Sequence, residues 1–237
     1  MNQMYTPPLT PTNKLILIVT AGVFLLQAVT GALGIINLSQ LFSLSASDFS
    51  RGLVYQLVTY PFVESQLMNV LFNGLVFWFI GSDLELLWGK RVYTRFLIMI
   101  TLLVGIIHLL LATLLFKGSS FYLSSLSGLT GLNFALLFAY AFTYPDRQMS
   151  FMMLFPMKAK AFCLLLAGIE GYFALFSSAY AAFSHLFAMG LSFLFIRYQN
   201  HLVVKSIFQK SLKREKKGKG HLYVVKSDKD EPPKYWQ

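Results

Sequence analysis

Six apolar segments, each close to the length that crosses a bilayer, constrain the fold of this 237-residue chain more than any other feature. They lie at roughly 14–37, 66–82, 92–116, 129–144, 159–178 and 181–199. A transmembrane helix needs about 20 mostly apolar residues, so the pattern predicts an all-α membrane protein. The composition agrees, because only 13% of the residues are charged, against about 25% in a typical soluble domain.

The fourth segment is short, and the stretch at 38–66 is too long to be a simple turn. Half of that stretch is apolar, which is typical of a segment lying in the membrane interface. We therefore expect residues 14–199 to form a six-helix bundle with a short central fourth helix and a long interfacial first loop. Residues 1–13 are expected to form a cytoplasmic N-terminus, and residues 200–237 a basic, disordered cytoplasmic tail.

The basic residues gather on one side of the predicted membrane. Six spans put both termini and the loops after the second, fourth and sixth segments on the same side. Those loops and the tail hold nearly all the Lys and Arg, whereas the opposite side keeps only Arg51 and Lys117. The positive-inside rule therefore places both termini in the cytoplasm.

This distribution also explains the net charge of +10 without a nucleic-acid partner. Basic residues beside membrane segments fix topology and attract anionic lipid headgroups. We therefore expect contact with the lipid bilayer and none with nucleic acid. The short length and the basic interior loops indicate a multi-pass protein of a bacterial inner membrane.

Two polar motifs open apolar segments where polar groups are costly and commonly functional. Residues 128–131 (Gly-Leu-Thr-Gly) open the fourth segment, and Ser184 and His185 open the sixth. A hydroxyl becomes a usable nucleophile only with a base within hydrogen-bond reach. Thr130 is therefore the candidate nucleophile, and His185 is the candidate general base and acid.

Candidate groups for an oxyanion site lie at the same depth. Asn69 and Asn73 are one helical turn apart in the second segment and could supply side-chain N–H groups. The start of the fourth helix supplies free backbone N–H groups and a favourable dipole, and Gly128 and Gly131 would let a substrate backbone approach. At about 1.5 Å of rise per residue, these groups fall within roughly 10 Å of one membrane boundary.

Over roughly residues 54–199 the chain resembles the rhomboid intramembrane proteases. The matching motifs occur in the family's order and on the expected helices. They are the first-loop motif at 55–62, the second-helix motif at 69–73, the Gly-x-x-x-Glu-x-x-x-Gly turn at 81–89, the Gly-x-Ser-Gly helix at 128–137, and the segments at 156–160 and 184–186. The resemblance implies the rhomboid fold and the hydrolysis of peptide bonds near the outer end of transmembrane substrates.

The chain departs from the family at several motif positions. Thr130 replaces the nucleophilic serine, Asn69 replaces the second-helix histidine, residues 55–56 (Tyr-Gln) replace Trp-Arg, and Phe134 replaces a tyrosine. Ala188 and Ser192 replace the glycines that follow the histidine, and both are small enough for close helix contact. The methyl group of a threonine restricts χ1 and crowds the attack geometry.

Two functions from different classes remain open. The retained hydroxyl and histidine favour an intramembrane endopeptidase that uses the Thr130 and His185 dyad. The departures favour a rhomboid pseudoprotease that binds transmembrane clients without cleaving them. Neither function requires a metal or a cofactor, and the sequence holds no metalloprotease or phosphate-binding motif.

Several polar residues have simpler interpretations. Thr130 could bond back to a helical carbonyl, and Asn73 could join helices through an interhelical hydrogen bond. We expect His108 to be a packing or interfacial residue and Glu85 to be structural, and we give Asn133 no role. Glu170 is either a protonated glutamate bonded to a neighbouring helix or a residue that faces a wet cavity.

Overall fold

The computed structural model describes residues 7–34, 36–115, 120–144, 148–151, 155–176 and 182–198. These residues belong to the first of two compact units, Met1–Arg197, apart from Tyr198, which begins the second. The predicted tail, 200–237, lies outside the described residues.

Within the described residues, three helices are long and apolar enough to cross a membrane. They are α1 (Pro11–Ala32), the continuous helix Leu67–Trp88 and the helix Lys90–Leu114. Three shorter apolar helices follow, namely α9 (Thr130–Thr143), α10 (Ala159–Phe176) and a last helix, Ala182–Tyr198. These helices support an all-α membrane protein. The presence of six membrane spans stays a prediction.

Two of the long helices contain a π-helical turn. The second consists of α5 (Leu67–Val76), the π turn η2 (Phe77–Gly81) and α6 (Ser82–Trp88). The third consists of α7 (Lys90–Leu110) and the π turn η3 (Leu111–Leu115).

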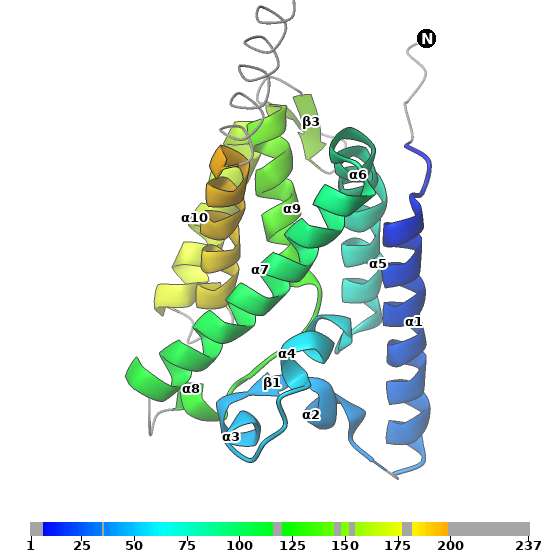
Figure 1. Ribbon diagram of the computed structural model, residues 1–237, viewed down its shortest axis with the longest axis vertical. Helices are drawn as coiled ribbons and strands as arrows, with labels where there is room; N and C mark the ends of the chain where they lie inside the picture. The colour runs from blue at the N-terminus through cyan, green and yellow to red at the C-terminus, as the bar shows by residue number, and fades with distance from the viewer. Residues whose placement is uncertain are drawn as a thin grey trace, which may run out of the picture. The chain divides into compact units, whose positions relative to one another are not determined.

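The first loop folds into short elements at the end of the bundle away from the N-terminus (Figure 1). In chain order they are α2 (Leu38–Phe42), β1 (Leu44–Ser45), α3 (Ala46–Phe49), α4 (Gln56–Thr59) and the 3-10 turn η1 (Tyr60–Phe62). After α8 (Ser120–Leu123), β2 (Ser125–Leu126) pairs antiparallel with β1. This pair joins the first loop to the residues before α9. A second hairpin, β3 (Gln148–Phe151) with β4 (Phe155–Lys158), lies between α9 and α10.

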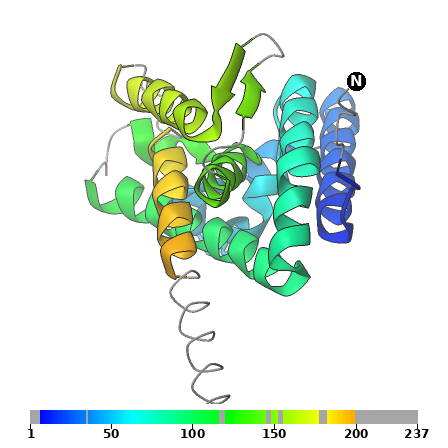
Figure 2. The same cartoon turned by 90° about the horizontal axis from the view of Figure 1, so that it is seen from above.

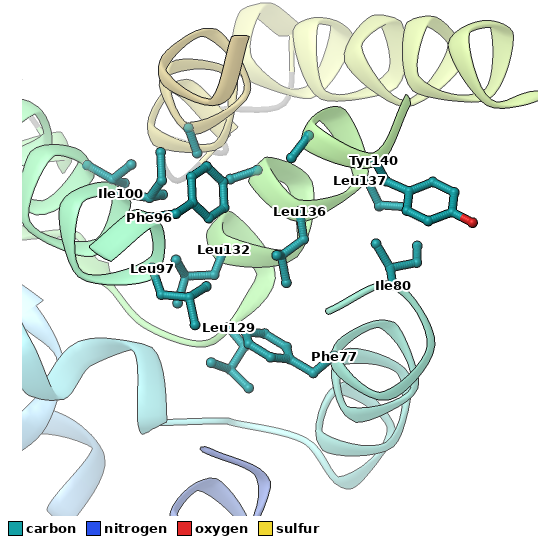
Figure 3. Close-up of a cluster of buried hydrophobic side chains, with 14 of the residues drawn as sticks. Phe77, Ile80, Phe96, Leu97, Ile100, Leu129, Leu132, Leu136, Leu137 and Tyr140 are labelled. Atoms are coloured by element: carbon teal, nitrogen blue, oxygen red, sulfur yellow. The ribbon is translucent and has the colours of Figure 1, made fainter. Parts of the chain in front are cut away.

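The short helix α9 lies among the other helices, as Figure 2 shows from above. It contacts α5, η2, α7 and α10. Its inner face presents Leu132, Leu136 and Leu137, which meet side chains of η2 and α7 such as Phe77 and Ile100 (Figure 3). The predicted central position of the fourth helix therefore agrees with its packing.

The last helix packs closely against α9 because its buried face is lined by small residues. Ala188 and Ser192 are both fully buried, and the Ser192 hydroxyl donates to the carbonyl of Ala135 at 2.7 Å. Small residues let helix backbones approach in a membrane. The two departures from the family's glycines thus preserve close helix contact.

A buried polar cluster joins α1 to α6 and α7. The Tyr93 hydroxyl donates to Asn13 Oδ1 at 2.7 Å, and Thr12 donates to Glu85. Gly81 lies directly beneath this cluster, since a Cβ there would stand 2.6 Å from the Tyr93 hydroxyl. Gly89, at φ +79°, ends α6 in a backbone conformation that glycine adopts readily. The turn that resembles the family's Gly-x-x-x-Glu-x-x-x-Gly motif is therefore structural here, as expected for Glu85.

We predict that Gly81→Ala lowers the free energy of unfolding by about 1–3 kcal/mol, the usual cost of overpacking. The added methyl group must displace the Tyr93 hydroxyl from Asn13. Thermal unfolding of the purified protein in detergent measures the effect. Gly22→Ala in α1 is the matched control, because nothing lies within 4 Å of its added Cβ. Adding Tyr93→Phe to Gly81→Ala should restore part of the loss. Equal unfolding temperatures for Gly81→Ala and Gly22→Ala would contradict the close approach of the Gly81 backbone to the Tyr93 hydroxyl.

Candidate functional site

The start of α9 is fixed by the first loop. Gly128, at φ +90°, donates its N–H to the Tyr60 carbonyl at 2.9 Å. The Tyr60 hydroxyl in turn donates to the carbonyl of Thr101 on α7 at 3.0 Å. One loop residue therefore positions the turn before Thr130 and anchors that turn to the third long helix.

The N-terminus of α9 is capped by the carboxylate of Glu64. Glu64 is 3% exposed, and its Oε1 accepts hydrogen bonds from the Leu129 N–H and from Asn73 Nδ2, each at 2.8 Å. A Cβ on Gly128 would stand 3.1 Å from both carboxylate oxygens. Glycine at 128 therefore makes room for this carboxylate, and the helix dipole favours a negative charge there.

Two opposing effects act on the pKa of Glu64. Burial raises the pKa above its ordinary value, and the hydrogen bonds from Leu129 and Asn73 lower it, with burial the larger effect. The protonated form of Glu64 is therefore favoured in the folded protein relative to an exposed glutamate.

Asn73 connects Thr130 to this carboxylate. Its Nδ2 donates to Glu64 and also lies 3.4 Å from Thr130 Oγ1, to which it donates. Its Oδ1 accepts from Asn133 Nδ2 at 2.6 Å. Asn73 therefore has both an interhelical role and direct contact with the candidate nucleophile.

His185 lies beside the residue that follows Thr130. A Cβ on Gly131 would stand 3.4 Å from His185 Cδ2, so the imidazole ring packs against the α9 backbone. The ring also packs at a tilt against Phe134, with ring centroids 5.5 Å apart. The structure thus brings Thr130, His185 and Gly131 to one end of α9.

The residue before His185 has a partner on α7. His108 Nδ1 and Ser184 Oγ are 3.0 Å apart, and both side chains are fully buried. His108 was expected to be a packing or interfacial residue, and this hydrogen bond gives it a specific role in joining α7 to the last helix.

Asn69 stands apart from the other candidates. Its side chain is exposed on α5, and no hydrogen bond joins it to the part of the chain that the structure describes. Of the two asparagines proposed for an oxyanion site, only Asn73 reaches Thr130. The side chain of Glu170 lies outside the described residues.

Sequence reasoning missed Glu64 and Asn133. Glu64 is the only charged residue between Arg51 and Asp83, and an isolated acid in an apolar loop could have indicated a buried, partnered carboxylate. Asn133 was given no role, although residues three apart are neighbours on a helix surface. Both side chains bond to Asn73.

The glutamine in the first-loop motif also has a structural role. Gln56 is fully buried; its Nε2 donates to the Leu41 carbonyl at 3.1 Å, and its Oε1 accepts from the Ser45 N–H at 3.3 Å. Gln56 therefore joins α4 to α2 and β1 within the first loop.

No group of three or more His, Cys, Asp or Glu side chains suited to a metal ion occurs within the described ranges.

A family described as "Eukaryotic integral membrane protein (DUF1751)" matches residues 14–217. No curated protein matches the chain. The family description confirms an integral membrane protein in contact with lipid. It overturns the expectation of a bacterial inner membrane, because the family is described as eukaryotic. The basic interior loops follow from membrane insertion in general, so neither they nor the short length of the chain identified the source.

We predict that Glu64→Gln removes part of the pH dependence of thermal stability. The folded pKa of Glu64 is raised, so its contribution to stability is complete below the unfolded pKa of about 4.3. That contribution is lost as the pH rises through the folded value. The wild-type unfolding temperature should therefore fall across that window, and the glutamine variant should fall less.

Glu64→Ala should instead destabilise the fold at every pH by about 1–3 kcal/mol, because it leaves buried donors on Leu129 and Asn73 unpaired. The control is Asp48→Asn, which removes a carboxylate paired at 3.5 Å with the exposed Arg51. An identical pH profile for wild type and Glu64→Gln would show that the carboxylate does not change its proton affinity on folding.

Proposed function

We propose that this chain, which belongs to the DUF1751 family of eukaryotic integral membrane proteins, is a rhomboid-like pseudoprotease that binds transmembrane segments of other proteins without cleaving them. One observation carries the proposal. A single carboxylate oxygen of Glu64 accepts from the Leu129 N–H and from Asn73 Nδ2, two donors beside Thr130 that could otherwise meet an oxyanion.

The charge of Glu64 also opposes hydrolysis. Attack on a peptide carbonyl develops a negative charge that must be met by free donors. Two unit charges about 4 Å apart repel by about 4 kcal/mol at an effective dielectric constant of 20, which corresponds to about a thousandfold loss of rate. Protonation of Glu64 would remove the charge, but the same oxygen would still occupy both donors.

The environment of Thr130 supports the same conclusion. Its hydroxyl accepts from Asn73 at 3.4 Å, and its methyl group restricts rotation toward a base. The Asn73 amide has only two N–H groups, and these serve Glu64 and Thr130. Asn73 therefore has no further donor for an oxyanion.

The exposed face of α5 supports client binding. Asn69 lies there among exposed apolar side chains, including Met68, Phe72 and Leu75. A polar amide facing lipid is costly, and a hydrogen bond to a neighbouring helix reduces that cost. A client's transmembrane helix would supply both the apolar contact and the partner for Asn69.

A second candidate is an intramembrane endopeptidase, favoured by the contact between His185 and Gly131. In that function Thr130 attacks, His185 acts as general base and acid, and Asn69, Asn73 and the Gly131 backbone hold the oxyanion. The predicted contribution of the Gly128 N–H would require that group to leave the Tyr60 carbonyl. It requires Glu64 to leave the Leu129 N–H before chemistry.

We predict no cleavage of a model transmembrane substrate in liposomes by wild type or by Thr130→Ala. Client capture should persist in Thr130→Ala, because the hydroxyl is not a binding contact in this proposal. Asn69→Ala should weaken capture about threefold to tenfold, the usual value of one interhelical hydrogen bond. Photo-crosslinking from α5 in native membranes, followed by mass spectrometry, measures capture.

Leu25→Ala is the control for capture, since Leu25 is 63% exposed on α1 and distant in sequence from Asn69. Wild-type cleavage that disappears in both Thr130→Ala and His185→Ala would replace this proposal with the peptidase. A Thr130→Ser, Glu64→Ala double variant leaves no side-chain oxygen on the Leu129 N–H. Cleavage by this variant, beside an inert wild type, would show that one methyl group and one carboxylate silence the site.

A further inference from the structure

An apolar groove of about 380 Å³ lies between α1, the first loop and α7. Its walls include Leu15 of α1, Phe62 of η1, Ile98 and Leu102 of α7, and Leu129 before α9. Among the described residues that line it, the polar ones are threonines. Figure 1 shows the first loop lying between α1 and α7. Both α1 and α7 belong to membrane-spanning candidates, so the groove opens where lipid chains lie.

The size of the groove decides what can occupy it. A transmembrane helix is about 10–12 Å wide and about 30 Å long, a volume several times larger than this groove. A single acyl chain is thin enough to enter. Thr94 and Leu102, which both line the groove, are eight residues apart, so the groove follows α7 for about 12 Å.

Two cations lie about one helical turn before the groove on α7. Lys90 and Arg91 precede Thr94 by four and three residues, the spacing of neighbours on one helix face. Both are exposed, and neither takes part in an ion pair with any residue that the structure describes. Long basic side chains near a helix end extend toward the headgroup layer.

We propose that this groove binds one anionic glycerophospholipid, with an acyl chain between α1 and α7 and the phosphate at Lys90 and Arg91. The apolar lining matches the chain, and the two free cations match the charge of the headgroup. The site belongs to the leaflet on the basic side of the membrane. It is separate from the Glu64 and Thr130 cluster, although Leu129 borders both.

The headgroup contact is tested by lipid retention. The full chain is reconstituted in nanodiscs of phosphatidylcholine with phosphatidylserine as a minor component, and retained lipid is counted by native mass spectrometry. Wild type should retain phosphatidylserine preferentially. Lys90→Ala and Arg91→Ala should each reduce that preference about fivefold, the value expected for one basic residue near anionic lipid. Lys14→Ala is the control, because Lys14 is an exposed cation at the start of α1 that does not line the groove.

The acyl-chain contact is tested separately by filling the groove. Ile98→Trp should reduce retention of both lipids, because Ile98 lines the groove and is 55% exposed. Ile106→Trp is the control on the same helix, since Ile106 is also exposed but lies outside the groove. Unfolding temperatures of all variants establish that each is folded before lipid is counted.

Either half of the experiment can overturn the proposal. If Lys90→Ala, Arg91→Ala and Lys14→Ala retain phosphatidylserine with equal preference, Lys90 and Arg91 do not form the headgroup site. Unchanged lipid retention in Ile98→Trp would show that no acyl chain occupies the groove. A photo-crosslinker at position 98 that yields a protein adduct, and not a lipid adduct, would assign the groove to a client helix or to a second copy of this chain.

Discussion

The hydrogen bonds accepted by Glu64 join three parts of the protein that are far apart in the sequence. Glu64 belongs to the first loop, Asn73 to α5 and Leu129 to the turn before α9, and one carboxylate oxygen bonds to both of the others. In a membrane protein the apolar surfaces of helices gain little from contact with one another, because lipid is as apolar as leucine. Buried polar contacts such as this one therefore determine which helices meet and at what depth α9 begins.

A second polar cluster does the same at the other end of the bundle. Asn13, Tyr93 and Glu85 bond α1 to α6 and α7, and Gly81 provides the space for that contact. Between the two clusters the core is almost wholly apolar, as the leucines of α9 show (Figure 3). An apolar centre held by polar contacts at both ends explains why the motif residues lie near the membrane boundaries.

Much of the helix pattern was predictable, because long apolar segments and a short fourth one are properties of the sequence itself. The candidate site was predictable only in part. Residue spacing placed Thr130, Asn73 and His185 near one end of the bundle, but it could not reveal that Glu64 turns inward, since that depends on how the first loop folds. Asn69 is exposed although it lies one helical turn from Asn73, because neighbouring helices cover only one side of α5. Its part in an oxyanion site stays a prediction. The eukaryotic source could not be read from charge, because the positive-inside pattern is common to many membranes.

The residues that most resemble a protease have sufficient structural reasons to be present. The His185 ring packs on the Gly131 backbone and on Phe134, so its loss would open a gap beside α9. Thr130 accepts from Asn73 at the first residue of a helix, where its hydroxyl helps to satisfy a buried amide. A hydroxyl and an imidazole at the right spacing are therefore compatible with either function. What distinguishes the two functions is whether the donors beside Thr130 are free for a substrate, and here Glu64 already occupies the Leu129 N–H and one N–H of Asn73.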